Sequence, residues 1–188
     1  MKIDLSFPHR YAVRRTELPS GKGPAPTVHY HPEPHPGRGE HWGLMLEIAP
    51  EGGQAWIGVF EGLGGYLSAV LSTPNPSELL VIADGQPYLV KVDDPKTVED
   101  LPCLPTTQAM PILAWQMIIL VDFTDLVAIG GKGILWRSER LVTDELRLVG
   151  VEGGVIKATG WSGGQGDVAF DVDPATGRII GPGGPDDH

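Results

Sequence analysis

The density of chain-breaking residues constrains this sequence more than any other feature. The chain contains 26 glycines and 18 prolines among 188 residues, well above average usage and without a collagen-like period. They divide the chain into short apolar stretches, whereas helices of ordinary size need longer periodic ones. Hydrophobic residues make up 41% of the sequence, enough for a buried core. The sequence therefore predicts an all-β protein of short strands joined by many turns.

The apolar pattern within these stretches follows the two-residue period of strands. In "HWGLMLEI" (41–48), Trp42, Leu44, Leu46 and Ile48 fall on one face. "LLVIADGQPYLVKV" predicts a hairpin, with Asp84-Gly85 supplying the positive-φ turn. Further strands are expected at 54–61, 65–72, 112–121, 126–129, 134–138, 145–151, 155–161, 167–172 and 178–180. The stretch 106–120 is the best helical competitor, but Pro111 and the β-branched residues argue against a helix.

Two stretches resemble each other at a fixed offset, each being an apolar strand that ends at an aspartate and re-enters an apolar strand. The aligned positions are Leu80, Ile82, Asp84, Tyr88 and Leu89 with Ile118, Leu120, Asp122, Leu126 and Val127. A repeat of about forty residues has the length of a propeller blade. Two or three such units are too few to close a propeller ring. We expect an antiparallel meander of blade-like sheets, propeller-like or packed as a sandwich or barrel.

The domain organisation follows from where the periodicity begins. Residues 1–38 show little of it, and "LPSGKGPAP" (18–26) breaks any element. We expect an irregular N-terminal arm over 1–38, with at most one edge strand. Residues 39–188 are expected to form a single all-β domain, the alternative being two packed halves that meet near 95–110.

The charge balance restricts the classes of partner. The formal net charge is -10 at pH 7, which repels nucleic acid and anionic membranes and attracts a basic protein or a cation. No stretch has the features of a signal peptide or the length of a membrane span. The one cysteine, Cys103, can form no internal disulfide. These features predict a cytoplasmic location.

Four of the six histidines lie in "TVHYHPEPHPGRGEHW" (27–42). In an extended segment His29 and His31 would leave the same face, close enough to share an ion. The intervening prolines favour polyproline geometry, which would put His31 and His35 roughly 12 Å apart, too far for one ion. No cofactor is expected. The alternative is a site formed by His29, His31 and His41 for zinc or another transition metal such as nickel or copper.

A second alternative is a hydrolase that uses Ser162 or Cys103. "GWSGG" (160–164) fits the nucleophile-elbow pattern, but a glycine loop and a strand follow it where the elbow requires a helix. Cys103 has no neighbouring histidine in the sequence and fits a small buried side chain.

The tryptophans are spread almost one per expected sheet, at Trp42, Trp56, Trp115, Trp136 and Trp161. Large aromatic side chains dominate cores, so we expect core packing. The alternative is that a minority of them line a binding face.

The second half of the chain carries a resemblance. Its residues are "LLVIADG", "ILVDFTDLVAIGGKGILWRS", "DELRLVGVEGGVIKATGW" and "VAFDVDPATGRI". Through these stretches the region 79–180, a little over half of the chain, resembles small uncharacterised bacterial all-β proteins with propeller-blade-like repeats. The resemblance implies an all-β, propeller-like architecture and supplies no catalytic residues.

These observations favour a non-enzymatic protein-interaction protein with a basic partner. One special case is an immunity-type inhibitor of a basic toxin, in which opposite charges would speed the encounter. The metal-binding module and the hydrolase stay open as alternatives. No catalytic set is assembled by the sequence alone.

Overall fold

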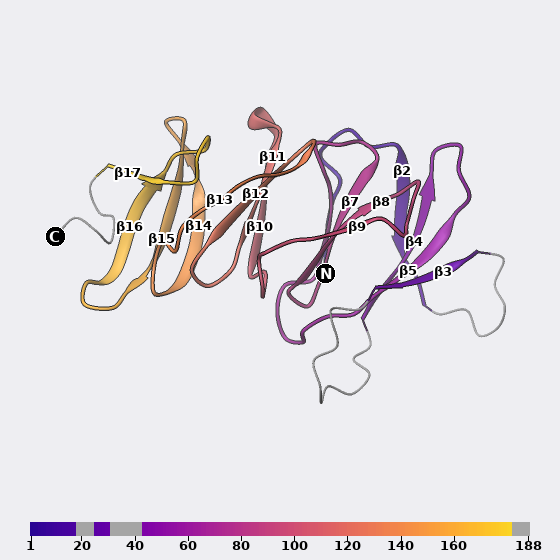
Figure 1. The fold of residues 1–188 in the computed structure, drawn as a ribbon, viewed down its shortest axis with the longest axis horizontal. Helices are drawn as coiled ribbons and strands as arrows, with labels where there is room; N and C mark the ends of the chain where they lie inside the picture. The colour runs from indigo at the N-terminus through magenta and orange to yellow at the C-terminus, as the bar shows by residue number, and fades with distance from the viewer. Residues whose placement is uncertain (18–24, 31–42, 182–188) are drawn as a thin grey trace. The chain divides into compact units, whose positions relative to one another are not determined.

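The structure of the protein is a computed structural model that describes residues 1–17, 25–30 and 43–181. These residues form an all-β fold, as predicted, with four sheets and one short 3-10 turn, η1 (Leu113–Trp115) (Figure 1). In this part of the chain no helix is long and apolar enough to cross a membrane. The chain divides into two compact units, Met1–Leu104 and Pro105–His188, and this boundary falls inside the interval 95–110.

The first unit contains two sheets. One has the strand order β1-β6-β7-β8-β9, and the other has the order β2-β4-β5-β3. Their strands are β1 (Lys2–Asp4), β2 (Tyr11–Arg15), β3 (Thr27–Tyr30), β4 (Leu44–Pro50), β5 (Trp56–Phe60), β6 (Ala69–Ser72), β7 (Glu78–Ala83), β8 (Gln86–Lys91) and β9 (Val98–Asp100). Inward residues of both sheets form one core, with Leu46, Phe60 and Val81 among its fully buried members.

The N-terminal residues contribute more strands than the sequence predicts. The expectation for 1–38 was an irregular arm with at most one edge strand, whereas β1, β2 and β3 each pair with a strand of a sheet. The physical reason is burial of apolar anchors between charged residues: Phe7 and Tyr11 are buried, and the Tyr11 hydroxyl donates to the Glu78 carbonyl at 3.0 Å. Residues 18–24 and 31–42 lie outside the described residues.

The predicted Asp84-Gly85 hairpin is confirmed. β7 and β8 pair in register from Glu78 opposite Lys91 to Ala83 opposite Gln86. Asp84 and Gly85 take φ values of 44° and 90°, the left-handed conformations that a two-residue turn requires.

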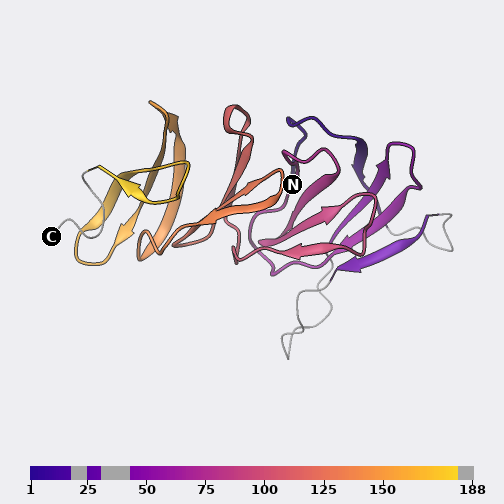
Figure 2. The ribbon, with the colours of Figure 1, turned by 45° about the horizontal axis from the view of Figure 1, so that its top comes forward.

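The second unit contains two four-stranded antiparallel meanders, β10-β11-β12-β13 and β14-β15-β16-β17. Their strands are β10 (Gln108–Ile112), β11 (Met117–Val121), β12 (Leu126–Gly130), β13 (Gly133–Arg137), β14 (Asp144–Glu152), β15 (Val155–Ser162), β16 (Gly166–Val172) and β17 (Ile179–Ile180). Figure 2 shows the second meander as orange-to-yellow strands. The two meanders share one core, in which Ile119 and Ala128 of the first meet Ile156 and Phe170 of the second.

The continuous strand predicted for 112–121 is wrong. The chain reverses there through η1 and Gln116, whose φ is 51°, and Ile112 pairs with Met117 across the resulting hairpin. A glutamine in the left-handed region carries no sequence signal for a turn, since glycine and asparagine are the residues that favour it.

Candidate protein-binding face

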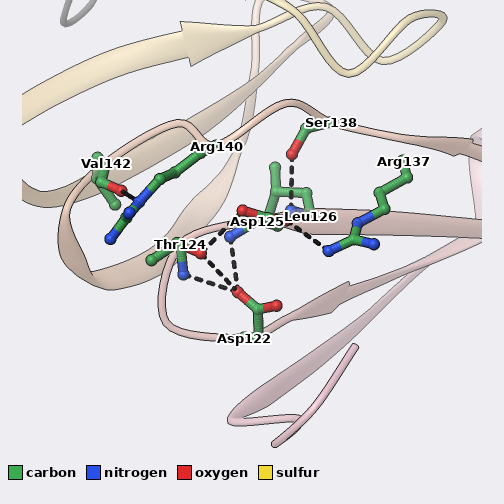
Figure 3. Close-up of polar contacts among 8 residues, drawn as sticks. All are labelled: Asp122, Thr124, Asp125, Leu126, Arg137, Ser138, Arg140 and Val142. Carbon is green, nitrogen blue, oxygen red and sulfur yellow. Dashed lines mark hydrogen bonds and ion pairs between the residues drawn. The ribbon is translucent and has the colours of Figure 1, made fainter. Parts of the chain in front are cut away.

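The turn between β11 and β12, formed by residues 122–125, is held by side chains. Asp122 is 8% exposed, and its Oδ1 accepts the backbone N–H groups of Thr124 and Asp125, both at 2.7 Å. The Thr124 hydroxyl donates to the Asp125 carboxylate at 2.8 Å. Figure 3 shows the two backbone N–H bonds converging on Asp122. Such buried, satisfied polar networks fix one conformation of a loop.

The segment 137–143 contacts the same turn through an ion pair and a hydrogen bond. Arg137 pairs with the Asp125 carboxylate at 2.8 Å, and the Ser138 hydroxyl accepts the Leu126 N–H at 2.8 Å. Arg140 donates to the Val142 carbonyl at 3.1 Å (Figure 3). Arg137 therefore binds an acceptor of the 122–125 turn, whereas Arg140 binds the Val142 and Thr143 carbonyls of its own segment.

The rigid turn presents Phe123, whose ring is 40% exposed, beside a hollow of about 580 Å³. We call this the Phe123 hollow. It is lined by Thr107, Gln108, Phe123, Asp144, Glu145, Leu146, Arg147 and Leu148. The Leu146 N–H donates to the Phe123 carbonyl at 3.0 Å, which fastens the turn to the start of β14.

The start of β14 departs from regular strand geometry. Glu145 has a φ of 56°, and the pairing with β15 shifts between Asp144 and Arg147. A non-glycine residue in the left-handed region costs on the order of 1 kcal/mol or more. Glu145 and Arg147 lie only loosely together, with 3.9 Å between the carboxylate and guanidinium, and both are well exposed. The irregularity therefore places two charged side chains on an open surface.

A second hollow of about 400 Å³ lies on the outward surface of β14, β15 and β16. We call this the Asp167 hollow. It is lined by Glu145, Arg147, Thr159, Gly160, Asp167, Val168 and Ala169. Thr159 is the register partner of both Arg147 and Ala169, so two small side chains lie between larger charged ones.

Trp161 lies next to this hollow. It is 40% exposed and is the register partner of Asp167, and directly opposite residues have Cβ atoms about 5 Å apart. In the described part of the chain no cation pairs with the Asp167 carboxylate. By contrast, Lys157 on the same surface is bound by Asp171 at 2.7 Å. The surface thus offers an exposed carboxylate beside an exposed indole.

The other described tryptophans are more enclosed, as expected for core residues. The Trp56 indole is buried and donates to the Val92 carbonyl at 3.0 Å. Trp136 donates to the Pro174 carbonyl at 2.8 Å and covers Gly177, where a Cβ atom would come within 2.5 Å of the ring. Among the described tryptophans, Trp161 fits the alternative prediction that a minority of the tryptophans line a binding face.

The predicted metal ligands are not brought together in the described residues. His29 lies on β3, whereas His31 and His41 lie outside the described residues. Within 1–17, 25–30 and 43–181 no group of three or more histidine, cysteine, aspartate or glutamate side chains has the arrangement of a metal site. The metal site therefore stays a prediction.

The structure describes both nucleophile candidates, Ser162 and Cys103. Ser162 ends β15, and its carbonyl accepts the Gln165 N–H at 2.7 Å in the hairpin turn that leads to β16. Cys103 is fully buried. A strand and a turn surround Ser162, and the strand β16 follows it where a nucleophile elbow requires a helix. The hydrolase therefore stays a prediction.

The sequence reasoning missed Phe123, Glu145, Arg147 and Asp167. Only Phe123 carried a signal, as a lone aromatic in the polar turn "DFTD". The hollows combine segments near 107, 123, 145 and 167, whose proximity depends on sheet packing.

No protein-family model matches the chain, and a search of curated proteins finds no match. The resemblance to bacterial proteins with blade-like repeats therefore stays a prediction.

Proposed function

We propose that the protein is a non-enzymatic protein-binding protein whose outward β14–β16 surface receives a basic segment of a partner protein. The observation that carries this proposal is the Asp167 carboxylate, which pairs with no cation among the described residues and lies beside the exposed Trp161. A lysine or arginine side chain would satisfy the carboxylate and lie against the indole face. Cation–π contacts contribute about 0.5 to 2 kcal/mol.

The shape of the Asp167 hollow supports a long, charged guest. Thr159 and Ala169 are small, whereas Glu145 and Asp167 add two carboxylates to the lining against the one guanidinium of Arg147. A guest cation would also draw Glu145 away from its loose 3.9 Å approach to Arg147. The chain charge of -10 would steer a basic partner toward the protein.

An immunity-type inhibitor of a basic toxin is one case of this function, since opposite charges give fast association. The same charge disfavours nucleic acid and anionic membranes as partners. The proposal includes a cytoplasmic location, supported by a single cysteine that is fully buried.

The proposal can be tested with a defined probe. The full chain would be immobilised and used to select binders from a random-sequence peptide display library. The affinity of each enriched peptide would then be measured by calorimetry for wild type and for the double variant Glu145→Lys/Asp167→Lys. We expect lysine- or arginine-containing peptides that bind the variant at least about tenfold more weakly, since close charge pairs at interfaces contribute more than 1 kcal/mol.

The matched control is Glu139→Lys/Glu152→Lys, which makes the same change in net charge at two exposed positions of the same unit. It should change the affinities by less than about twofold, the range of exposed charges outside an interface. Enriched peptides without basic residues, or equal losses in both double variants, would contradict the proposal.

A further inference from the structure

The two hollows differ in what they offer a guest. In the Phe123 hollow the uncharged polar side chains are already hydrogen-bonded within the protein, and the charged ones are Asp144, Glu145 and Arg147. The Gln108 amide donates to the Leu148 carbonyl at 3.0 Å and accepts the Leu148 N–H at 2.9 Å. The Thr107 hydroxyl donates to the Val121 carbonyl at 3.1 Å. Because both amide ends and the hydroxyl proton are used within the protein, a polar guest would gain little from these two side chains.

The apolar part of the lining can receive an apolar side chain, with the three charged side chains beside it. Phe123 is exposed, and Leu146 and Leu148, largely buried, also line this hollow. The Asp122 network holds the turn in one conformation, so a guest would not have to order it. Aromatic side chains fixed in advance are typical of the anchor points of protein interfaces.

The hollows are neighbours on one surface. Glu145 and Arg147 line both of them, so a single segment of a partner can reach both. The Asp167 hollow carries the uncompensated carboxylate, and the Phe123 hollow carries the exposed ring.

We infer that the Phe123 hollow is a second subsite, and that the partner segment carries a large apolar side chain near its basic one. This inference rests on the proposed function and specifies the chemistry of the partner. The apolar side chain fills the Phe123 hollow while the lysine or arginine lies between Asp167 and Trp161.

The test is a double-mutant cycle on the full chain with the selected basic peptides as probes. Each large apolar residue of a peptide would be replaced by alanine, and each peptide pair would be measured against wild type, Phe123→Ala and Phe123→Leu. Val149→Ala is the matched control, because Val149 is an apolar residue of β14 that is 66% exposed and lines neither hollow. Far-ultraviolet circular dichroism would verify that each variant is folded.

We expect Phe123→Ala to weaken the parent peptide by about tenfold, as for a typical anchor residue. It should have little effect on the peptide whose apolar residue is already alanine, and Phe123→Leu should restore part of the affinity. Val149→Ala should leave every affinity within about twofold.

The outcomes separate the two proposals. Binding that depends on Asp167 and is unchanged by Phe123→Ala would overturn the second subsite and leave the proposed function in place. An equal loss for both peptides of every pair would also overturn it. If no peptide depends on Glu145 and Asp167, the proposed function itself fails.

Discussion

The β7–β8 and β11–β12 hairpins begin their turns with aspartates that align in the sequence, yet the two turns are built differently. Asp84 enters the left-handed region at φ 44°, and Gly85 completes a two-residue turn. Its side chain accepts the Ser68 hydroxyl at 2.7 Å. Asp122 instead accepts two backbone N–H groups of a longer turn, 122–125.

The two turns therefore use the same strand–aspartate sequence pattern in two ways. The Asp84 turn joins its strands through backbone conformation alone and adds no exposed ring. The Asp122 turn needs its side chain to satisfy two part-buried backbone donors, and the two extra residues allow Phe123 to be exposed beside a hollow. A shared aspartate therefore predicts where a strand ends, but it does not predict which side chains the turn exposes.

Replacing each aspartate tests this comparison directly and should give the largest effect on the free energy of unfolding. Asp122→Ala leaves two backbone N–H groups without their acceptor, so we expect the free energy of unfolding to fall by about 2 to 3 kcal/mol. Asp84→Ala loses one hydroxyl bond at a half-buried site and should lower it by about 1 kcal/mol. Urea denaturation measures both values, and equal losses would show that the two turns are held in the same way.

Glu145, the strained residue of the proposed binding face, should give a smaller effect of opposite sign on stability. Glu145→Gly relieves a side chain at φ 56° and should raise the free energy of unfolding by up to about 1 kcal/mol. It should also weaken the basic peptides, because it removes a carboxylate from both hollows. Gln116→Gly, at φ 51°, is the control: a similar gain in stability with unchanged binding. Unchanged peptide affinity for Glu145→Gly would remove Glu145 from the site.

A second buried carboxylate extends the comparison, and its replacement should give the smallest effect on stability. In contrast to Asp122, Glu78 of β7 is 8% exposed, and its Oε2 atom has no hydrogen-bond partner in the described structure. Burial raises the pKa of Glu78; the Lys91 charge opposes this shift and Glu99 adds to it.

A raised pKa means that the folded state favours the protonated acid. Its contribution to stability is complete below the unfolded pKa and is lost as the pH rises through the folded value. Glu78→Gln keeps a neutral side chain, so its stability relative to wild type should rise as the pH increases above the ordinary glutamate pKa of about 4. Denaturation midpoints across this range measure the difference. A constant difference would show that Glu78 has its ordinary pKa.

The sequence is sufficient for the features that local rules determine. The all-β class follows from the short alternating stretches, and Asp84-Gly85 predicts its own turn. Likewise, "DPATG" forms a turn in which Gly177 takes a φ of 72° and Asp173 accepts the Ala175 N–H at 3.0 Å.

Features that depend on distant partners were not predictable. The N-terminal strands are stabilised by pairing with β4, β5 and β6, and with three to five residues each they are too short to show a clear period of their own. Gln116 adopts a conformation that its residue type does not favour. The proposed binding face could not be predicted for the same reason, since Phe123 and Asp167 come from separate hairpins.

The most direct test of the binding face is an NMR titration of the uniformly ¹⁵N-labelled full chain with a selected basic peptide. The account predicts that the largest shift changes fall on the Trp161 indole N–H and the Thr159 and Ala169 amides, with the Trp56 indole unmoved as an internal reference. Shift changes confined to the unit Met1–Leu104, or an unmoved Trp161 at saturating peptide, would contradict it.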